Sequence, residues 1–247
     1  MEARAHIMGT SQSAQGSRWL LVCLASWGLA ACQTSPPRQV PPQETPPPAA
    51  APAVPAGARE FQVVAAESLL QVMVFRGGAM ARLGHNHVIA SHQLAGPVYV
   101  TDDPFGTRFD ISFPVDELTV DEPALRAAAG PDFPPAVPEN ARVSTRANLL
   151  SPALLDGAQF PSVRLRATDV RAAGEAYDVG VEVTLKGSTY ALRVPVTVQR
   201  QEGAIVASGE FPLKQSQLGL KPFTAAMGAL LVLDDMRVKF AVTARPQ

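Results

Sequence analysis

Three histidines lie close together in the sequence, in a pattern that could support chemistry. His85 and His87 are two residues apart, and His92 follows five residues later. In an extended strand, residues two apart project from the same face, so both imidazoles would point the same way. Imidazoles in this arrangement can bind Zn or Cu, with His92 as a third ligand. They could instead bond to backbone around Gly84 and Asn86, contact the polar head of a ligand, or transfer protons.

Acidic side chains form a second group of candidates, but their sequence surroundings do not favour catalysis. Carboxylates act as general acids or bases when apolar neighbours perturb their pKa values. Eight of the carboxylates either cluster on the stretch 115–123 or lie in pairs near turns, and we interpret them as solvated loop charges: Asp116, Glu117, Asp121 and Glu122 in the cluster, and Asp102, Asp103, Asp234 and Asp235 near turns. The strand–serine–helix turn that is typical of a hydrolase nucleophile is absent. The sequence therefore predicts no catalytic residue and no enzymatic activity.

Cys32 is a candidate for lipidation. It ends the run Leu29-Ala30-Ala31-Cys32, which follows a positively charged start and an apolar segment over residues 19–29. That segment is too short to span a bilayer as a helix and has the length of a signal-peptide core. The run resembles the bacterial lipobox. The resemblance implies that residues 1–31 are a lipoprotein signal peptide and that Cys32 carries acyl chains such as palmitate.

The neighbours of this cysteine complete the anchoring prediction. Gln33 follows it, and by resemblance to known sorting rules the absence of aspartate there favours the outer membrane, facing the periplasm. Residues 32–58 contain the cysteine and a proline-rich linker, which cannot bury a core and favours polyproline II. The other cysteine, Cys23, lies within the predicted signal peptide. The mature chain would then have no thiol available for a disulfide.

Residues 59–247 form the predicted folded domain, and their dominant signal is a period-two alternation of apolar side chains. Strands are predicted over residues 69–75, 94–100, 108–115, 162–170, 177–185, 190–198, 205–213 and 236–244. A hairpin turn is predicted at Gly187-Ser188, and Pro195 indicates an edge position or a bulge. About eight strands with short turns favour an antiparallel β-barrel. A helical insertion at about 121–160, with a helix over 139–150, interrupts them.

Four segments of this domain carry a family resemblance. They are Ala66-Glu67-Ser68-Leu69-Leu70-Gln71-Val72, Phe160-Pro161-Ser162-Val163-Arg164, Val183-Thr184-Leu185-Lys186-Gly187-Ser188-Thr189 and Phe211-Pro212-Leu213-Lys214-Gln215-Ser216-Gln217-Leu218-Gly219-Leu220. In order and spacing, over residues 59–244, they resemble the YceI-like, or polyisoprenoid-binding, family of bacterial periplasmic proteins. The resemblance implies an all-β, extended lipocalin-like antiparallel barrel whose apolar interior holds an isoprenoid chain. The histidine-rich stretch Gly84-His85-Asn86-His87 departs from the family pattern.

The predicted function is the binding or carriage of an amphiphilic isoprenoid, quinone-like or polyprenyl, in the barrel interior. The residues expected to line the ligand are Val72, Val74, Phe109, Ile111, Phe113, Leu165, Val181, Val183, Leu192, Val194 and Phe240. His85, His87 and His92 are expected at its polar head or at a metal. The alternatives are a periplasmic metal-binding protein, or a barrel filled by its own side chains.

Expected partners are the lipid and the anchoring membrane, with a homodimer left open. Lys and Arg are scattered at a net charge of −1, without a basic stripe interleaved with aromatics, which argues against nucleic acid as a partner.

Overall fold

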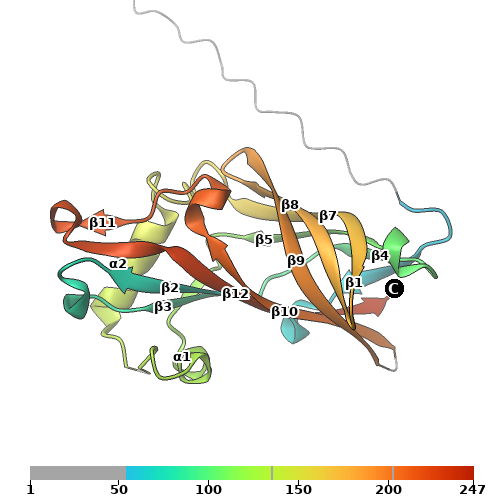
Figure 1. The fold of residues 1–247 in the computed structure, drawn as a ribbon, viewed down its shortest axis with the longest axis horizontal. Coiled ribbons are helices and arrows are strands. Elements are labelled where there is room, and N and C mark those ends of the chain that lie inside the picture. The colour runs from blue at the N-terminus through green and yellow to red at the C-terminus, as the bar shows by residue number, and fades with distance from the viewer. Residues whose placement is uncertain (1–53, 135, 202) are drawn as a thin grey trace, which may run out of the picture. The chain divides into compact units, whose positions relative to one another are not determined.

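The computed structural model describes residues 54–134, 136–201 and 203–247 (Figure 1). The predicted signal peptide, Cys32 and most of the proline-rich linker lie outside the described residues. Within the described ranges, no helix is both long enough and apolar enough to cross a membrane.

The described residues form one antiparallel sheet of twelve strands that closes on itself as a barrel (Figure 1). The strands are β1 (Arg59–Val63), β2 (Leu69–Gly77), β3 (His87–Ser91), β4 (Pro97–Val100), β5 (Arg108–Pro114), β6 (Thr119–Val120), β7 (Ser162–Ala173), β8 (Ala176–Leu185), β9 (Ser188–Gln201), β10 (Ala204–Lys214), β11 (Thr224–Ala225) and β12 (Leu230–Pro246). In this part of the chain, eight of them close the ring in the order β1-β4-β5-β7-β8-β9-β10-β12, with β12 pairing back to β1. The predicted antiparallel barrel is confirmed.

The long strand β12 makes the barrel extended rather than short. One of its edges pairs with β10 over ten residue pairs, from Ile205↔Ala244 to Lys214↔Asp235. Its other edge pairs with β1 near its C-terminal end and with β2 toward its N-terminal end. Because β2 carries β3 and β6 with it, these strands continue one wall of the barrel beyond the closed ring.

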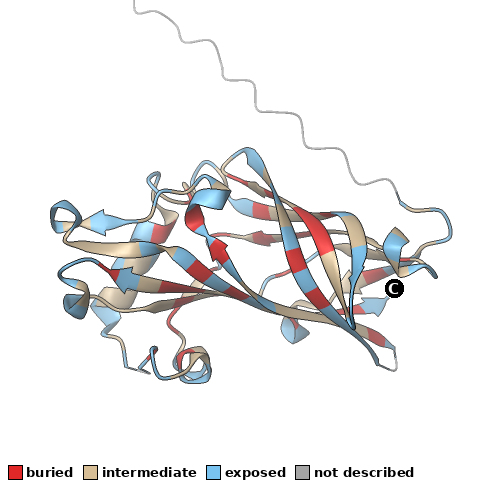
Figure 2. Cartoon of the chain, in the orientation of Figure 1, coloured by how far each residue is buried: buried red, intermediate tan, exposed pale blue. Residues whose placement is uncertain are grey.

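The alternation in the sequence places every second side chain of a strand inside the barrel. In β8, Val179, Val181, Val183 and Leu185 are buried, and Figure 2 shows buried and exposed positions alternating along the strands. The turn after β8 is Lys186-Gly187, because Leu185 pairs with Ser188. Both turn residues have positive φ, as a two-residue hairpin of the right twist requires. The predicted turn at Gly187-Ser188 was therefore wrong by one residue.

One other strand prediction needs correction, and a second agrees with the structure. The strand expected over 94–100 is the shorter β4, which begins at Pro97 after Gly96 in a positive-φ conformation. Pro195 agrees with its prediction, because β9 pairs with both β8 and β10 but Pro195 itself has a partner only in β8, which makes it a local edge position. The ladder between β9 and β10 ends at the pair Thr197↔Ser208. Pro195 lies just beyond that pair, so it interrupts no pairing with β10.

The insertion between β6 and β7 contains α1 (Pro123–Ala129) and α2 (Glu139–Leu150), so the helix expected over 139–150 is confirmed. The loop after α1 packs on the outer face of β2, where Met73 contacts Phe133 and Val88 in one buried cluster. This contact explains why the sequence of β2 is apolar on both faces. Short 3-10 turns complete the described fold: η1 (Ala65–Glu67), η2 (Ala81–Leu83), η3 (Pro104–Gly106), η4 (Gln215–Leu218) and η5 (Ala226–Gly228).

Candidate functional site

A cavity of about 530 Å³ lies inside the barrel. This volume falls in the usual range for small-molecule sites, roughly 300–1,000 Å³. The barrel is therefore hollow, and the alternative of an interior filled by its own side chains does not describe it. All eleven residues that the sequence placed against a ligand line this cavity. Their contact with a ligand stays a prediction.

The walls formed by the ring strands are almost entirely apolar, and we call this part of the cavity the apolar end. It is lined by β5, β7, β8, β9, β10 and the C-terminal half of β12. Gly209 shows how closely these walls are fitted. It pairs with Phe240, and a Cβ at Gly209 would lie 2.8 Å from the Phe240 ring. A glycine there lets the aromatic ring lie against the neighbouring strand while it lines the cavity.

The opposite part of the cavity, which we call the polar end, is lined by the polar side chains of Arg76, His85, His87, Ser144, Thr145 and Asn148. The segment Gly84-His85-Asn86-His87 enters β3 with an alternation of its own. His85 and His87 line the cavity with ring centroids 6.1 Å apart, whereas Asn86 does not line it. The prediction that both imidazoles share one face agrees with this arrangement.

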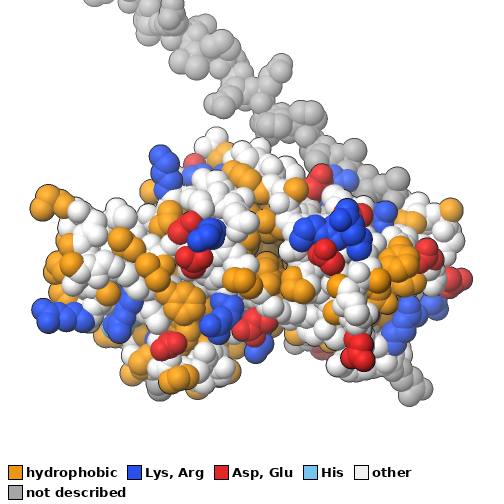
Figure 3. Space-filling model, viewed as in Figure 1, with side chains coloured by type: hydrophobic (Ala, Val, Ile, Leu, Met, Phe, Trp, Pro, Cys, Tyr) orange, Lys and Arg blue, Asp and Glu red, His pale blue; other side chains and the backbone are white. Residues whose placement is uncertain are grey.

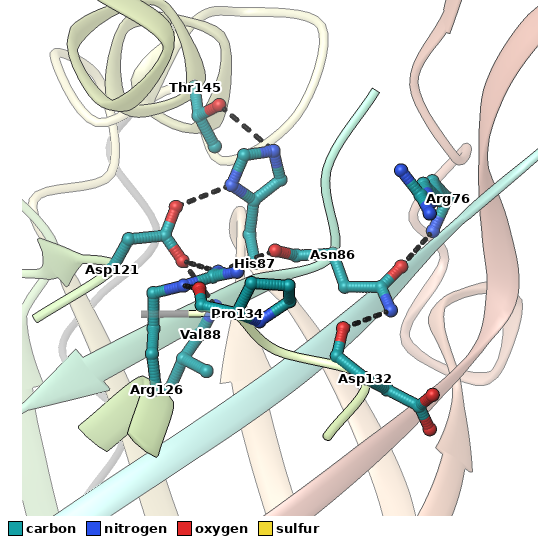
Figure 4. Close-up of polar contacts among 9 residues, drawn as sticks. All are labelled: Arg76, Asn86, His87, Val88, Asp121, Arg126, Asp132, Pro134 and Thr145. Carbon is teal, nitrogen blue, oxygen red and sulfur yellow. Dashed lines mark hydrogen bonds and ion pairs between the residues drawn. The ribbon is translucent and has the colours of Figure 1, made fainter. Parts of the chain in front are cut away.

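Asn86 ties the entry of β3 to its surroundings. Its Oδ1 accepts a hydrogen bond from the backbone N–H of Arg76 (2.9 Å), and its Nδ2 donates to the carbonyl of Asp132 (2.9 Å) (Figure 4). One side chain thus joins β2 to the loop that follows α1. This double contact fixes the backbone on which the two histidines lie.

His87 bridges a buried carboxylate and helix α2 (Figure 4). Its Nδ1 lies 2.6 Å from Oδ2 of Asp121, and its Nε2 lies 3.3 Å from the hydroxyl of Thr145. A carboxylate only accepts hydrogen bonds, so Nδ1 carries the proton in this pair. The Nε2 atom of a neutral His87 is then an acceptor on the cavity side. It can accept a hydrogen bond from Thr145 or from a ligand.

Asp121 is held by three donors although it is 1 % exposed. The backbone N–H of Val88 donates to Oδ1 (2.9 Å), and Nη1 of Arg126 donates to the same oxygen (2.5 Å). Burial alone would raise the pKa of Asp121, but the hydrogen bonds from His87, Val88 and Arg126 outweigh burial and hold that pKa below its usual value. The carboxylate is therefore ionised and orients the His87 ring.

Arg126 completes this network from α1, and it is also 1 % exposed. Its guanidinium donates to the carbonyls of Asn86 (2.6 Å) and Pro134 (2.7 Å) besides Asp121, and it lies over the Phe133 ring at 5.8 Å. A buried cation is tolerated when it is paired and its donors are satisfied, as they are here. The pair holds the loop after α1 against the entry of β3.

His85 lies in a different electrostatic setting from His87. Its imidazole makes no hydrogen bond within the described part of the chain, although it lines the cavity. Burial lowers the pKa of His85, and electrostatic interactions with His87, Arg126 and Arg76 lower it further, while Asp121 opposes the shift. Neutral His85 is thus favoured. The polar end offers a neutral imidazole beside Arg76, which forms no ion pair among the described residues and donates to the carbonyl of Gly84 (2.6 Å).

One face of α2 closes the polar end from the other side. Ala141, Ser144, Thr145, Asn148 and Leu149 line the cavity, at the three- and four-residue spacing that places side chains on one helix face. Ser144 and Asn148 are exposed as well as cavity-lining, and so are Arg76 and Phe223. These residues mark where the cavity opens to solvent.

His92 does not join the other two histidines. It does not line the cavity, and its Nε2 lies 2.8 Å from Glu122, which also accepts from the hydroxyl of Thr119. Burial would raise the pKa of Glu122, but the hydrogen bonds from Thr119 and His92 lower it. Across the described ranges, no group of three His, Cys, Asp or Glu side chains could hold a metal ion. His92, the predicted third ligand of a Zn or Cu site, therefore does not lie beside His85 and His87.

The interpretation of the eight named carboxylates as solvated loop charges was wrong for Asp121 and Glu122. Asp121 is buried in the ion pair with Arg126, and Glu122 is half-buried against His92. Asp116 and Glu117 are exposed, as expected. Sequence reasoning also missed Arg126 and Thr145. For Thr145, the spacing of the cavity-facing residues within the predicted helix was a usable signal. Arg126 lies in an alanine-rich helix, and its sequence neighbours give no signal that it is buried.

The family model described as the YceI-like domain matches residues 85–244 of this chain. The chain belongs to the YceI-like domain family. The match begins at His85, so β1 and β2 precede it, although the sequence resemblance was drawn from residue 59 onward. No curated protein gives a significant match.

Solved structures share the barrel of this YceI-like domain. BcnA from Burkholderia cenocepacia is similar at 15 % identity with a TM-score of 0.54, over 73 % of this chain and 98 % of that chain. A polyisoprenoid-binding domain from Saccharophagus degradans, implicated in plant cell wall breakdown, is similar at 11 % identity with a TM-score of 0.50, over 76 % and 98 %. At such low identity these likenesses establish the fold.

Proposed function

We propose that this YceI-like domain binds an amphiphilic lipid of the isoprenoid class, with its hydrocarbon chain in the apolar end and its head at the polar end. The observation that carries the proposal is the asymmetry of the cavity, which has apolar walls at one end and polar side chains at its opening. Burial of apolar surface favours binding by roughly 25 cal/mol per Å². The loss of ligand freedom offsets part of that gain.

The groups at the polar end suit a head that both accepts and donates hydrogen bonds. Nε2 of His87 is an acceptor, and Arg76 and Asn148 supply donors at the opening. A polyprenyl hydroxyl can both donate to Nε2 of His87 and accept from these donors, whereas a quinone-like carbonyl or an ionised phosphate can only accept from Arg76 and Asn148. A charged or polar group placed in the apolar end would lose its hydrogen bonds, which sets the direction in which the ligand enters. The description of one structural neighbour as a polyisoprenoid-binding domain agrees with this ligand class. The domain then acts as a carrier or binding protein rather than an enzyme.

Native mass spectrometry of the gently purified full chain tests the proposal. We expect an additional mass that corresponds to a bound lipid. Ala207→Phe, which places an aromatic ring in the cavity, should remove that mass, whereas Ala191→Phe on the exposed face of β9 should keep it. A chain that is free of lipid in repeated preparations, and that takes up neither an isoprenoid alcohol nor a quinone of equal chain length, would contradict the proposal.

We further propose that the chain is delivered as a lipoprotein of the outer membrane, facing the periplasm. In this proposal residues 1–31 are removed, Cys32 is acylated, and residues 32–58 tether the domain. The run Leu29-Ala30-Ala31-Cys32 supports it. Labelling cells with radioactive palmitate should mark the wild-type chain and Cys23→Ser, but not Cys32→Ser. Fractionation of the membranes should place the label in the outer one, and a labelled Cys32→Ser chain would exclude this anchor.

A further inference from the structure

Exposed apolar side chains gather in two segments of the domain, residues 76–87 and 219–233, which together we call the tip. Nine large hydrophobic side chains are exposed in the described part of the chain, and five of them belong to the tip: Met80, Leu83, Phe223, Met227 and Leu233. Met227 is fully exposed. Single exposed apolar residues are ordinary, but a concentration of them in two segments indicates a contact surface.

The two segments of the tip are held together by backbone contacts. The N–H of Met80 donates to the carbonyl of Ala229 (2.8 Å), and Gly77 pairs with Leu231 in the β2–β12 ladder. A Cβ at Gly78 would lie 2.5 Å from the carbonyl oxygen of Ala229, and Gly78 has a φ of +86°. This close approach requires glycine. The exposed apolar side chains therefore belong to one structural unit at one end of the barrel.

The charge of the tip has one sign. Its two segments contain Arg76, Arg82 and Lys221 and no Asp or Glu. Arg82 and Lys221 are exposed and form no ion pair within the described residues. The carboxylates that follow the tip, Asp234 and Asp235, accept hydrogen bonds from Ser216 and Lys214. In Figure 3, the end of the barrel that carries β11 shows hydrophobic and basic side chains at its extremity, without acidic ones.

The tip also borders the opening of the cavity. Arg76 and Phe223 belong to the tip, are exposed and line the cavity, as do Ser144 and Asn148 of α2. Further residues of the tip, Leu230 and Leu231, line the cavity behind them. A surface in contact with the tip would therefore lie next to the entrance through which a ligand passes.

We infer that the tip docks on the surface of a lipid bilayer that contains anionic lipids, with Leu83 and Met227 inserted between the headgroups. Apolar side chains flanked by Arg and Lys are the combination that binds such an interface. This inference rests on the proposed function, because docking would place the cavity opening against the membrane that supplies or receives the lipid. A protein partner for the same surface would be an outcome of the test below.

A fluorescent label on the tip tests docking directly. Cys23 and Cys32 are the only cysteines in the chain, so Cys23→Ser with Cys32→Ser gives a full-length, cysteine-free background. Met227→Cys in that background is labelled with an environment-sensitive nitrobenzoxadiazole probe. Val198→Cys, another exposed apolar position outside the tip, is the matched control. Both proteins are mixed with vesicles of phosphatidylcholine, with or without an equal share of phosphatidylglycerol.

We expect emission from position 227 to shift to the blue and to be quenched by spin-labelled lipid with the anionic vesicles, while emission from position 198 does not change. Arg82→Glu with Lys221→Glu should weaken this response by about tenfold or more, since each basic residue near an anionic surface contributes to binding. Arg59→Glu with Arg200→Glu, which reverses two exposed charges outside the tip, should leave it intact.

An unchanged signal from position 227, or equal shifts at 227 and 198, would overturn the inference. A response that is equal on neutral vesicles would also overturn it, because the basic residues would then have no part. Binding of an isoprenoid alcohol in solution, measured by native mass spectrometry without vesicles, separates the two proposals. A chain that binds the lipid but shows no tip response contradicts docking alone, and a chain that does neither contradicts both.

Discussion

The two ends of the cavity are built in different ways. The apolar end is formed by regular strands, in which every second residue faces inward and many apolar side chains share the lining. The polar end depends on four side chains from four separate elements: His87 at the start of β3, Asp121 after β6, Arg126 in α1 and Thr145 in α2. We expect the apolar end to tolerate exchanges between apolar side chains of similar size, because its apolar character is shared by many residues. The other should be sensitive, because each group there has a named partner.

The largest effect is expected from Asp121→Asn, which leaves the buried guanidinium of Arg126 without its carboxylate. Breaking a buried ion pair in this way costs about 3–5 kcal/mol of unfolding free energy. Asp169→Asn, which breaks an exposed pair with Arg193, is the matched control and should leave the urea midpoint nearly unchanged. Equal midpoints for the two variants would remove the contrast between the buried network and an ordinary surface pair.

The apolar end can be probed without a change of shape. Val181→Thr replaces a methyl group with a hydroxyl in the wall of the cavity, and a bound hydrocarbon chain would then cover that hydroxyl. We expect affinity for an isoprenoid alcohol to fall by about tenfold, equivalent to roughly 1.4 kcal/mol. Val198→Thr, on the exposed part of β9, should have no effect. A titration with a fluorescent analogue of the isoprenoid alcohol measures the affinity of both variants. Unchanged affinity in Val181→Thr would mean that the hydrocarbon chain does not lie against β8.

His87→Ala tests the polar end through a ratio of affinities. Loss of one hydrogen bond to the head should weaken binding of an isoprenoid alcohol by roughly fivefold, while binding of the bare hydrocarbon of equal length stays the same. Dividing the affinity for the alcohol by the affinity for the hydrocarbon cancels any effect of the substitution on the stability of the barrel. His92→Ala, whose imidazole contacts Glu122 outside the cavity, should not change the ratio. If the two variants behave alike, His87 does not contact the head.

The smallest effect concerns His85 and pH. Its pKa is lowered in the folded state, so the unfolded chain binds more protons as the pH falls below the ordinary histidine value of about 6.5. The contribution of His85 to stability is thus complete above that pH and declines below it. We therefore expect the urea midpoint of wild type to fall relative to that of His85→Gln as the pH is lowered from 7 to 5. A difference between the two midpoints that does not change with pH would indicate that His85 titrates as in the unfolded chain.

The two ends also differ in how far the sequence predicts them. Period-two alternation indicated nine of the eleven lining residues, from Phe109 to Phe240, because strand geometry repeats every two residues and needs no knowledge of distant partners. The strand over 69–75 is apolar on both faces, so alternation did not show which of its faces is inward. The polar end joins His87 to residues 34 and 58 positions away, Asp121 and Thr145. Asp121 follows β6 with a positive φ and is buried, and no local pattern in the sequence indicates this. Its burial could only be seen in the structure.

A crystal structure of the full chain with a bound isoprenoid alcohol tests the central claim most directly. We expect elongated density for the hydrocarbon chain between β5, β8 and β10, with the hydroxyl within hydrogen-bonding distance of Nε2 of His87. Density in the reverse direction, lipid outside the barrel, or side chains of opposing walls in contact throughout the interior would contradict it.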